Sequence, residues 1–291
     1  MASIEDYGKF ETAWCPGCGN FPLLKSLKQA LADSDIAPHQ VLLSSGIGQA
    51  AKTPHYLRCN AFNGLHGRHL PVSTGAKLAN PDLVVISESG DGCTYGEGGN
   101  HFLAALRRNL DMTLLVHDNQ IYGLTKGQAS PTTSEGHQTK AQPWGQPSSG
   151  FNPVAVAVAM RAGFVARGFV GQGDHLASLI SQAIAFKGFA LVDIFQPCVS
   201  FNKVNTFSWY KDRCYQLGED HDPTDFMQAM EKAEEWGEKI PIGVIWKNEE
   251  RPTFESHLPM LEKGPMATRT LDREALKKVM TRYASPATKI F

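Results

Sequence analysis

The stretch DLVVISESGDG, residues 82–92, is the part of the sequence that most strongly indicates the fold. Asp82 to Ser87 is a short apolar run, which is typical of a buried strand covered on both faces. The run leads into Gly90-Asp91-Gly92, where glycine lets the backbone adopt unusual dihedral angles and come close to a bulky group. We therefore expect a buried strand that ends in a binding turn.

Similar apolar runs recur along the chain and alternate with segments of helical periodicity. This alternation predicts an α/β fold with a mostly parallel sheet and helices on both faces. The expected strands are 41–47, 82–87, 112–117, 164–170, 190–195 and 240–246. The expected helices are 21–31, 97–109, 154–162, 175–186, 223–237 and 271–283. The polar stretch 123–150 predicts a long loop, and such loops are usually functional or disordered.

Length and charge limit the classes of protein that fit. The chain has 291 residues, and we expect a main domain over 1–210 and a more highly charged C-terminal extension over 211–291 that packs on it or on a partner subunit. The formal net charge of −1 gives no basic footprint for nucleic acid. No apolar run approaches the roughly 20 residues of a membrane helix, and Met1 to Phe10 lacks a hydrophobic signal region. We expect a cytoplasmic protein.

Polar side chains follow two of the expected strands. Asp91 comes directly after one strand, and Asn119 ends the next apolar run. Because ligands gather beyond the carboxyl ends of parallel strands, we expect both side chains at one edge, where oxygen ligands would suit Mg²⁺ and a phosphate group. The helix expected from Glu97 would point its amino end at that anion. Gly-Asp-Gly alone also fits an ordinary turn. The preceding strand, the following helix and Asn119 favour a diphosphate site.

Cysteines suggest a second site. Cys15 and Cys18 form the Cys-x-x-Cys turn WCPGCG, and Cys59 and Cys198 lie in segments expected to be loops. In a chain without a secretory signal, cysteines are usually free thiols or metal ligands in a reducing compartment rather than disulfide partners. The soft thiolates fit zinc or a [4Fe–4S] cluster, and their spacing does not separate the two. A buried, inert thiol is the usual alternative for a lone cysteine, and we apply it to Cys214.

Longer segments resemble one family, the β subunit of 2-oxoacid:ferredoxin oxidoreductases. Pyruvate, 2-oxoglutarate and branched or aromatic 2-oxoacids all fit this subunit class, and overall similarity favours 2-oxoglutarate. Gly-Asp-Gly followed by Asn after about thirty residues is similar to the thiamine diphosphate motif. The similar segments are spread, in family order, over a span of about two thirds of the chain. They are WCPGCGNF from Trp14, SSGIG from Ser44, KTPHY from Lys52, LHGR from Leu65, TGAKLANPDLVV from Thr74, ESGDG from Glu88, NHF from Asn100, RRNLDMTLLVHDNQIYGLTKGQASPT from Arg107 and QPCVSFN from Gln196.

The resemblance implies thiamine diphosphate and Mg²⁺ at the expected sheet edge. Asp91 and Asn119 would be side-chain ligands of Mg²⁺, and Ile121 would offer its backbone carbonyl. Other residues would line the diphosphate or approach the cofactor from neighbouring strand ends: Gly90, Gly92, Cys93, Ser45, Gly46 and His66.

The resemblance also implies a substrate site. Lys52 would contact the substrate carboxylate, and Lys52 and His66 are the residues assigned to catalysis. Leu124, Thr125 and Lys126 would shape the pocket for the rest of the 2-oxoacid. A structural role for His66 and a solvent-exposed Lys52 are the alternatives.

For the thiols, the resemblance favours one [4Fe–4S] cluster over zinc. Three cysteines match its ligands: Cys15, Cys18 and Cys198. Many relatives have their fourth cysteine at the position of Gln49, so we assign Cys59, ten residues later, as the substitute ligand. Cys214 is the other possible fourth ligand.

The resemblance implies a reversible reaction in which a 2-oxoacid and coenzyme A give an acyl-CoA, CO₂ and two electrons. The cluster would pass these electrons to ferredoxin, and the reverse direction fixes CO₂, as in the reductive TCA cycle. In this family the glutamate that activates thiamine belongs to the α subunit, so we expect a heterodimer or a dimer of heterodimers with an apolar interface. The alternatives are a non-redox thiamine diphosphate decarboxylase or carboligase, and a zinc-stabilised, non-catalytic interaction subunit.

Overall fold

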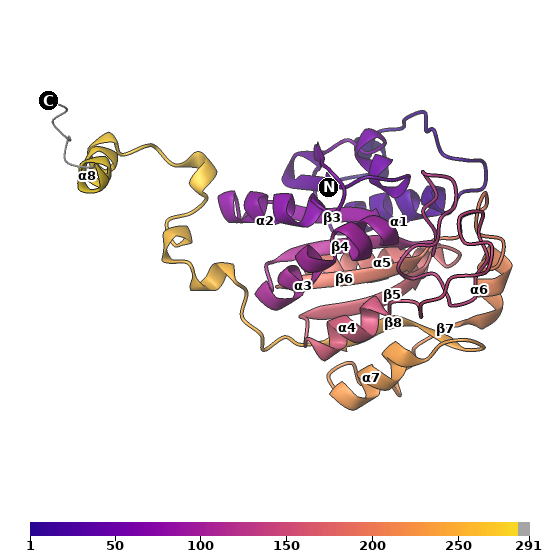
Figure 1. Ribbon diagram of the computed structural model, residues 1–291. Coiled ribbons are helices and arrows are strands. Elements are labelled where there is room, and N and C mark those ends of the chain that lie inside the picture. The colour runs from indigo at the N-terminus through magenta and orange to yellow at the C-terminus, as the bar shows by residue number, and fades with distance from the viewer. Residues whose placement is uncertain (285–291) are drawn as a thin grey trace, which may run out of the picture.

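Eight strands form one sheet in the computed structural model, which describes residues 1–284 (Figure 1). The strand order is β2-β1-β3-β4-β6-β5-β8-β7, and all neighbouring strands are parallel except β5 and β8. The strands are β1 (Val41–Ser45), β2 (Asn60–Asn63), β3 (Val84–Gly90), β4 (Met112–Asp118), β5 (Phe164–Phe169), β6 (Phe189–Phe195), β7 (Cys214–Gln216) and β8 (Ile240–Lys247).

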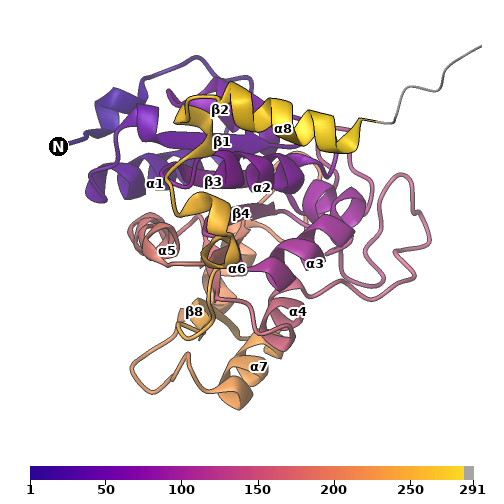
Figure 2. The same ribbon diagram turned by 90° about the vertical axis from the view of Figure 1, so that its left-hand side faces the viewer.

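Helices cover both faces of this sheet (Figures 1 and 2). The covering helices are α1 (Asn20–Asp33), α2 (His69–Ala79), α3 (Gly99–Arg108), α4 (Pro153–Ala159), α5 (Gly173–Ala185), α6 (Phe207–Arg213) and α7 (Phe226–Glu234), and a further helix, α8 (Arg273–Tyr283), lies away from the sheet (Figure 1). Alternate strand residues supply two cores, because successive side chains of a strand point to opposite faces. Ile86 and Leu115 pack with α1, α5 and α6, whereas Val85 and Leu114 pack with α2, α3, α4 and α7. The predicted fold class is therefore confirmed.

Four elements were not predicted: β2, β7, α2 and α6. All of β2 is exposed and β7 has three residues, so neither has the apolar run that marks a buried strand. In α2, Pro71 and Gly75 weaken the helical pattern. The predicted helix at Glu97 begins differently, because a π-helical turn over Gly92–Glu97 comes first and α3 starts at Gly99. Such π-helical turns are rare and often lie at functional sites.

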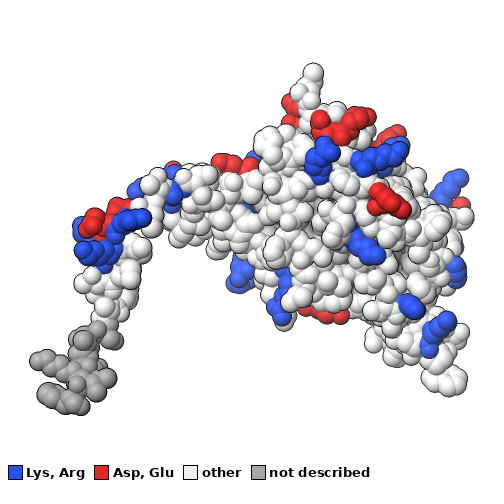
Figure 3. All heavy atoms as spheres, turned by 90° about the horizontal axis from the view of Figure 1, so that it is seen from above, with Lys and Arg blue, Asp and Glu red and all other residues white. Residues whose placement is uncertain are grey.

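The region after residue 210 falls into two parts. The first part, residues 211–254, adds the strands β7 and β8 to the main sheet and contains the helix α7. The second part, residues 255–284, is called the C-terminal arm here, and it projects from the body with an exposed α8 at its far end (Figures 1 and 3). Within residues 1–284 no helix is both long and apolar enough to cross a membrane.

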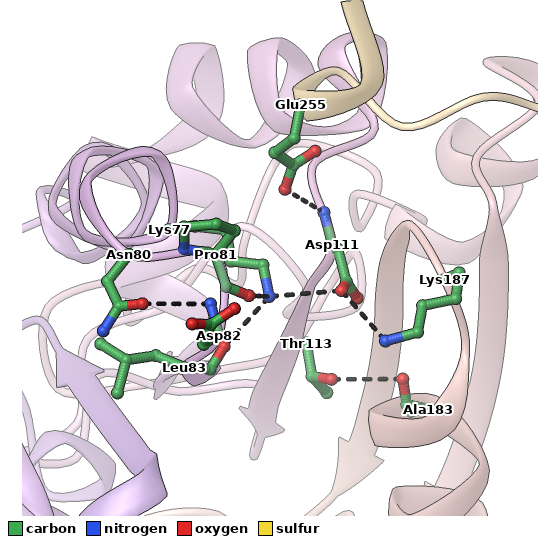
Figure 4. Close-up of polar contacts among 10 residues, drawn as sticks. All are labelled: Lys77, Asn80, Pro81, Asp82, Leu83, Asp111, Thr113, Ala183, Lys187 and Glu255. Atoms are coloured by element: carbon green, nitrogen blue, oxygen red, sulfur yellow. Dashed lines mark hydrogen bonds and ion pairs between the residues drawn. The ribbon is translucent and has the colours of Figure 1, made fainter. Parts of the chain in front are cut away.

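An ion pair between a buried lysine and a partly exposed aspartate lies at the edge of the sheet where the parallel strands begin, called the amino edge (Figure 4). The Lys77 ammonium lies 3.2 Å from the Asp111 carboxylate and donates hydrogen bonds to the carbonyls of Pro81 and Leu83. Glu255, at the start of the C-terminal arm, accepts a 2.8 Å hydrogen bond from the Asp111 backbone N–H. The arm thus leaves the body at the amino edge, and the long loop lies at the other end of the sheet (Figure 1).

Candidate functional site

Asp91 lies at the carboxyl edge of the sheet beneath the long loop. Gly90 pairs with His117 across β3 and β4, so the residues after both strands emerge side by side. The Asp91 carboxylate is 1% exposed and accepts hydrogen bonds from Ser130 (2.5 Å) and Thr132 (2.7 Å). The polar loop therefore folds back over the Gly-Asp-Gly turn.

Asn119 emerges at the same edge but has different partners. Its side-chain N–H₂ donates to the Gln196 carbonyl oxygen at 3.2 Å, and its own Oδ1 accepts from the Ile121 N–H at 3.0 Å. The Asn119 backbone carbonyl accepts a hydrogen bond from Asn202. Asp91 is thus held by the loop, whereas Asn119 is held by the segment that follows β6.

Three buried carboxyl groups lie close together at this edge: Asp91, Asp118 and Asp193. The Thr132 hydroxyl is 2.7 Å from Asp91 and 2.8 Å from Asp118. Because its single proton serves only one carboxylate, the second short contact requires a proton on the carboxyl itself. Burial raises the pKa of Asp91 and, together with the neighbouring Asp193 carboxylate, raises the pKa of Asp118 well above its usual range.

Asp193 is the third member of this group. Burial raises its pKa to about 6, although the Tyr95 hydroxyl (2.6 Å) and the Arg167 guanidinium favour the charged form. A cavity of about 360 Å³ adjoins the group and is lined in part by Asp118, Asp193, Arg167 and Trp236. A divalent cation near Asp91 would favour ionisation here, because it would supply the positive charge that the buried carboxyl groups lack.

Two glycines allow close packing around the Gly-Asp-Gly turn. A Cβ atom on Gly46 would lie 2.5 Å from the Cys93 sulfur, and one on Gly92 would clash with the Tyr122 ring. The buried Cys93 sulfur accepts hydrogen bonds from the backbone N–H groups of Ile47 (3.3 Å) and Gly67 (3.1 Å). Cys93 therefore joins three segments at the predicted diphosphate turn.

Ser45 positions the segment that carries Lys52. Its hydroxyl donates to the Ala51 carbonyl (2.9 Å) and accepts from the Asn63 amide (2.7 Å). Lys52 itself is partly exposed. The structure thus gives Ser45 a supporting role beside one of the predicted substrate contacts.

The histidine predicted near the cofactor is partly exposed, and a second histidine is buried. The His66 side chain is 44% exposed and lies 3.6 Å from Glu97. His69, which the sequence interpretation missed, is buried and contacts the Ser87 hydroxyl at 2.7 Å. Burial lowers the pKa of His69 to about 3, so its ring is neutral at physiological pH.

The predicted substrate residues Leu124, Thr125 and Lys126 form an exposed turn. A β-bridge between Tyr122 and Gln128 closes this turn, and Lys126 adopts a left-handed conformation with φ of 78°. The three side chains lie on the surface of the chain.

Three of the predicted cluster ligands lie near one another. Burial raises the pKa of the Cys18 thiol, and the neighbouring thiols of Cys198 and Cys15 raise it further. Two N–H groups oppose this effect: the backbone N–H of Asn20 and the side-chain amide of Gln196, whose nitrogen lies 3.6 Å from the Cys18 sulfur. These thiols and their donors match the surroundings of a thiolate-bound cluster.

The predicted fourth ligand, Cys59, and its alternative, Cys214, lie elsewhere. Cys59 immediately precedes β2, whereas Cys198 follows β6, so the two lie toward opposite edges of parallel strands. Both Cys59 and Cys214 pack against the core that contains α1, and burial raises the pKa of each thiol to about 12. Among residues 1–284, no three Cys, His, Asp or Glu side chains converge closely enough to hold a single metal ion.

Buried polar residues that the sequence interpretation missed connect the two sites. His117 lies 2.7 Å from the Glu88 carboxylate and 2.8 Å from the Asn20 side-chain oxygen, and Thr53 donates to Glu88. This chain of contacts joins β3 and β4 to the start of α1, just after Cys18. The available signal was an ionisable side chain at the end of an apolar run, since Glu88 and His117 come just after the hydrophobic residues of β3 and β4.

Two family models match the chain. The model described as "Thiamine pyrophosphate enzyme, C-terminal TPP binding domain" matches residues 35–194. The model for the C-terminal part of the "Pyruvate ferredoxin oxidoreductase beta subunit" matches residues 198–263. Together they include the Gly-Asp-Gly turn, the long loop and the segment that begins with Cys198.

Curated relatives and a solved structure are also similar to this chain. The 2-oxoacid:ferredoxin oxidoreductase 1 subunit beta of Aeropyrum pernix is 44% identical over 84% of this chain and 80% of its own length. The 2-oxoglutarate oxidoreductase subunit KorB of Mycobacterium tuberculosis is 41% identical over 66% of this chain and 52% of its own length. A chain of the 2-oxoglutarate:ferredoxin oxidoreductase from Magnetococcus marinus, solved with 2-oxoglutarate, coenzyme A and succinyl-CoA bound, superposes with a TM-score of 0.89 at 35% identity, covering 98% of this chain and 97% of that one.

Proposed function

Because this chain belongs to the β-subunit family of the 2-oxoacid:ferredoxin oxidoreductases, we propose that it is the subunit that binds thiamine diphosphate and carries the cluster in such an enzyme. The reaction converts a 2-oxoacid and coenzyme A to an acyl-CoA and CO₂, and two electrons pass through a [4Fe–4S] cluster to ferredoxin. The observation that supports this proposal is the contact of one side chain, that of Gln196, with both Asn119 and Cys18, which belong to the proposed diphosphate and cluster sites.

The residues at the carboxyl edge fit a magnesium-bound diphosphate. The Asp91 carboxylate, the Asn119 side-chain oxygen and the Ile121 carbonyl would hold Mg²⁺, and the backbone of Gly90 and Gly92 would approach the diphosphate. When bound, thiamine diphosphate supplies the electron sink that decarboxylation requires. A bound cation would favour the carboxylate form of Asp91, because its positive charge would offset the effect of burial that raises the pKa of this group.

For the substrate, Lys52 and Lys126 provide positive charge that orients a carboxylate, and His66 contacts the cofactor side of the site. Leu124 and Thr125 complete the pocket for the rest of the 2-oxoacid. We favour 2-oxoglutarate, because its second carboxylate gives Lys126 a partner and because several relatives are named as 2-oxoglutarate enzymes.

The activity requires an α subunit that contributes the glutamate for thiamine activation. The curated relatives are named as β subunits, which supports an assembly of several chains. The exposure of residues 124–126 also supports this assignment, since a substrate pocket excludes water only when another surface covers these side chains. The isolated chain is therefore expected to show no turnover.

The two alternatives explain fewer features. A non-redox thiamine enzyme has no use for the neighbouring thiols of Cys15, Cys18 and Cys198. A zinc-stabilised interaction subunit leaves unexplained why the long loop closes over a buried Asp91.

The test is ferredoxin reduction by the anaerobically purified complex of this chain with its α subunit. The panel contains 2-oxoglutarate, pyruvate, and a branched and an aromatic 2-oxoacid, each with and without coenzyme A. We expect CoA-dependent reduction that is fastest with 2-oxoglutarate, and none from the chain alone. Full turnover by the isolated chain would refute the need for a partner, and no reduction with any 2-oxoacid would refute the activity.

Lys126→Ala tests the substrate assignment within the same assay. We expect a larger loss of kcat/KM with 2-oxoglutarate than with pyruvate, because only the former has a second carboxylate. Equal losses would show that Lys126 does not select the side chain.

A further inference from the structure

We propose that Gln196 is a positioning residue that couples the magnesium anchor to the cluster: its side-chain oxygen orients Asn119, and its N–H₂ group tunes the reduction potential through Cys18. This role rests on the proposed function and assigns a specific residue to the link between the two halves of the reaction.

The location of Gln196 gives it access to both sites. It directly follows β6, and its backbone N–H donates to the Asp118 carbonyl at the end of β4 at 2.9 Å, so the backbone is fixed by the sheet. The residue is 1% exposed. A buried amide at this point keeps one orientation, because turning it over would leave buried polar atoms without hydrogen-bond partners and would destabilise the folded protein.

The hydrogen bonds define which end of the amide faces each site. The oxygen of Gln196 accepts from the Asn119 side-chain N–H₂ at 3.2 Å. The nitrogen donates to the Pro197 carbonyl at 3.1 Å and to the Cys18 sulfur at 3.6 Å, which accounts for both of its hydrogens. A reversed amide would place an oxygen against the Cys18 sulfur and a donor against the donating group of Asn119.

Gly19 keeps the contact close. A Cβ atom on Gly19 would lie 2.7 Å from the Gln196 nitrogen and 3.2 Å from the Pro197 nitrogen. The Cys-x-x-Cys turn thus packs directly on Gln196 because the residue after Cys18 has no side chain.

On the cluster side, the consequence is electrostatic. Reduction adds negative charge to a cluster and its thiolate sulfurs, so an N–H group pointing at one of those sulfurs stabilises the reduced state more than the oxidised one. The Gln196 amide adds to the backbone N–H of Asn20, which also donates to Cys18. Removing the Gln196 donor should therefore lower the reduction potential.

On the cofactor side, the consequence is geometric. Because Gln196 holds the nitrogen of Asn119, the Asn119 oxygen remains on the side of Ile121, whose carbonyl is the expected backbone ligand of Mg²⁺. Without this contact only the Ile121 N–H holds the Asn119 amide, and a rotation that turned its nitrogen toward the cation would remove the ligand.

Two substitutions separate these roles in the assembled complex. Gln196→Glu keeps an oxygen that accepts from Asn119 but replaces the N–H donor with a negative charge, whereas Gln196→Leu removes both functions. Gln182→Glu, on the exposed side of α5, is the matched control. The readouts are an EPR-monitored redox titration of the cluster and the Mg²⁺-dependent dissociation constant of thiamine diphosphate.

We expect the ratio of reduced to oxidised cluster at a fixed potential to fall about tenfold in both Gln196 variants, which for a one-electron centre corresponds to about 59 mV. The dissociation constant should stay within about twofold of wild type in Gln196→Glu and rise about tenfold in Gln196→Leu, or about 1.4 kcal/mol. Wild-type values of both quantities in both variants would overturn the proposal.

A measurement on the wild-type complex does not depend on how well the variants fold. With ¹⁵N placed in glutamine side chains, pulsed EPR of the reduced cluster should show coupling to one amide nitrogen. Absence of that coupling in a complex that contains the cluster would refute the role of Gln196 but leave the proposed function intact. A wild-type complex without any cluster would refute both.

Discussion

Replacing Asp193 by asparagine should remove a stability penalty that grows as the pH rises toward neutrality. Asp193 is buried among carboxyl groups, and its folded-state pKa is about 6, compared with 3.8 for an unperturbed aspartate. The folded protein therefore resists ionisation of this group, whereas the unfolded chain ionises it freely. Asparagine keeps an oxygen that accepts the 2.6 Å hydrogen bond from Tyr95, but it carries no charge to bury.

The size of the effect follows from the two pKa values. The pKa of Asp193 is higher in the folded protein than in the unfolded chain. Its contribution to the free energy of unfolding is therefore fully present below about pH 4 and is lost as the pH rises through 6. Each pH unit between the two values costs about 1.4 kcal/mol, so the full penalty above pH 7 is about 3 kcal/mol. At pH 5 only about half of this penalty has developed.

Urea unfolding followed by circular dichroism at pH 5, 6 and 7.5 measures this difference. The free energy of unfolding of Asp193→Asn, relative to that of wild type, should rise by about 1.4 kcal/mol between pH 5 and 7.5. Asp82→Asn, at an exposed position, is the control and should show no such trend. A stability difference that is constant with pH, or that shrinks as pH rises, would contradict the buried-charge explanation.

Three further predictions concern the candidate site. Asp91→Asn should weaken Mg²⁺-dependent binding of thiamine diphosphate about 100-fold in a calorimetric titration, or about 2.7 kcal/mol, and unchanged affinity would exclude Asp91 as a ligand. Cys198→Ser should lose the visible absorption of the cluster, whereas Cys59→Ser should retain it because Cys59 lies apart from the other thiols; the reverse pattern would restore Cys59 as a ligand. Gly46→Ala should cost about 1–3 kcal/mol of folding stability, because its Cβ meets the Cys93 sulfur, and adding Cys93→Ala should recover part of the loss in a urea melt; no recovery would place the strain elsewhere.

The sequence was sufficient to predict the central sheet. Long apolar runs such as 112–117 and 190–195 form strands that are buried on both faces, and the structure has them within one or two residues. The pattern failed for β2 because an exposed edge strand has no core-facing run. It also failed for α2, where packing overrides a weak local helical preference.

The candidate site was only partly predictable for a different reason. The positions of Asp91 and Asn119 follow from strand ends, which local pattern reveals. The contacts of Gln196 with Asn119 and Cys18 depend on segments separated by 77 and 178 residues, and no local pattern encodes them. The same limitation applied to Cys59: distance along the chain allowed it to approach the other cysteines, but its place before β2 holds it near the opposite edge.

The central claim is that a thiamine site and an iron–sulfur cluster exchange electrons within this subunit. The most direct measurement is EPR of the anaerobic complex with its α subunit, frozen after addition of 2-oxoglutarate. We predict a reduced-cluster signal that requires thiamine diphosphate and Mg²⁺ and that is absent from the Asp91→Asn complex. A cluster that stays oxidised in the complete wild-type mixture, or one reduced equally well without thiamine diphosphate, would contradict the account.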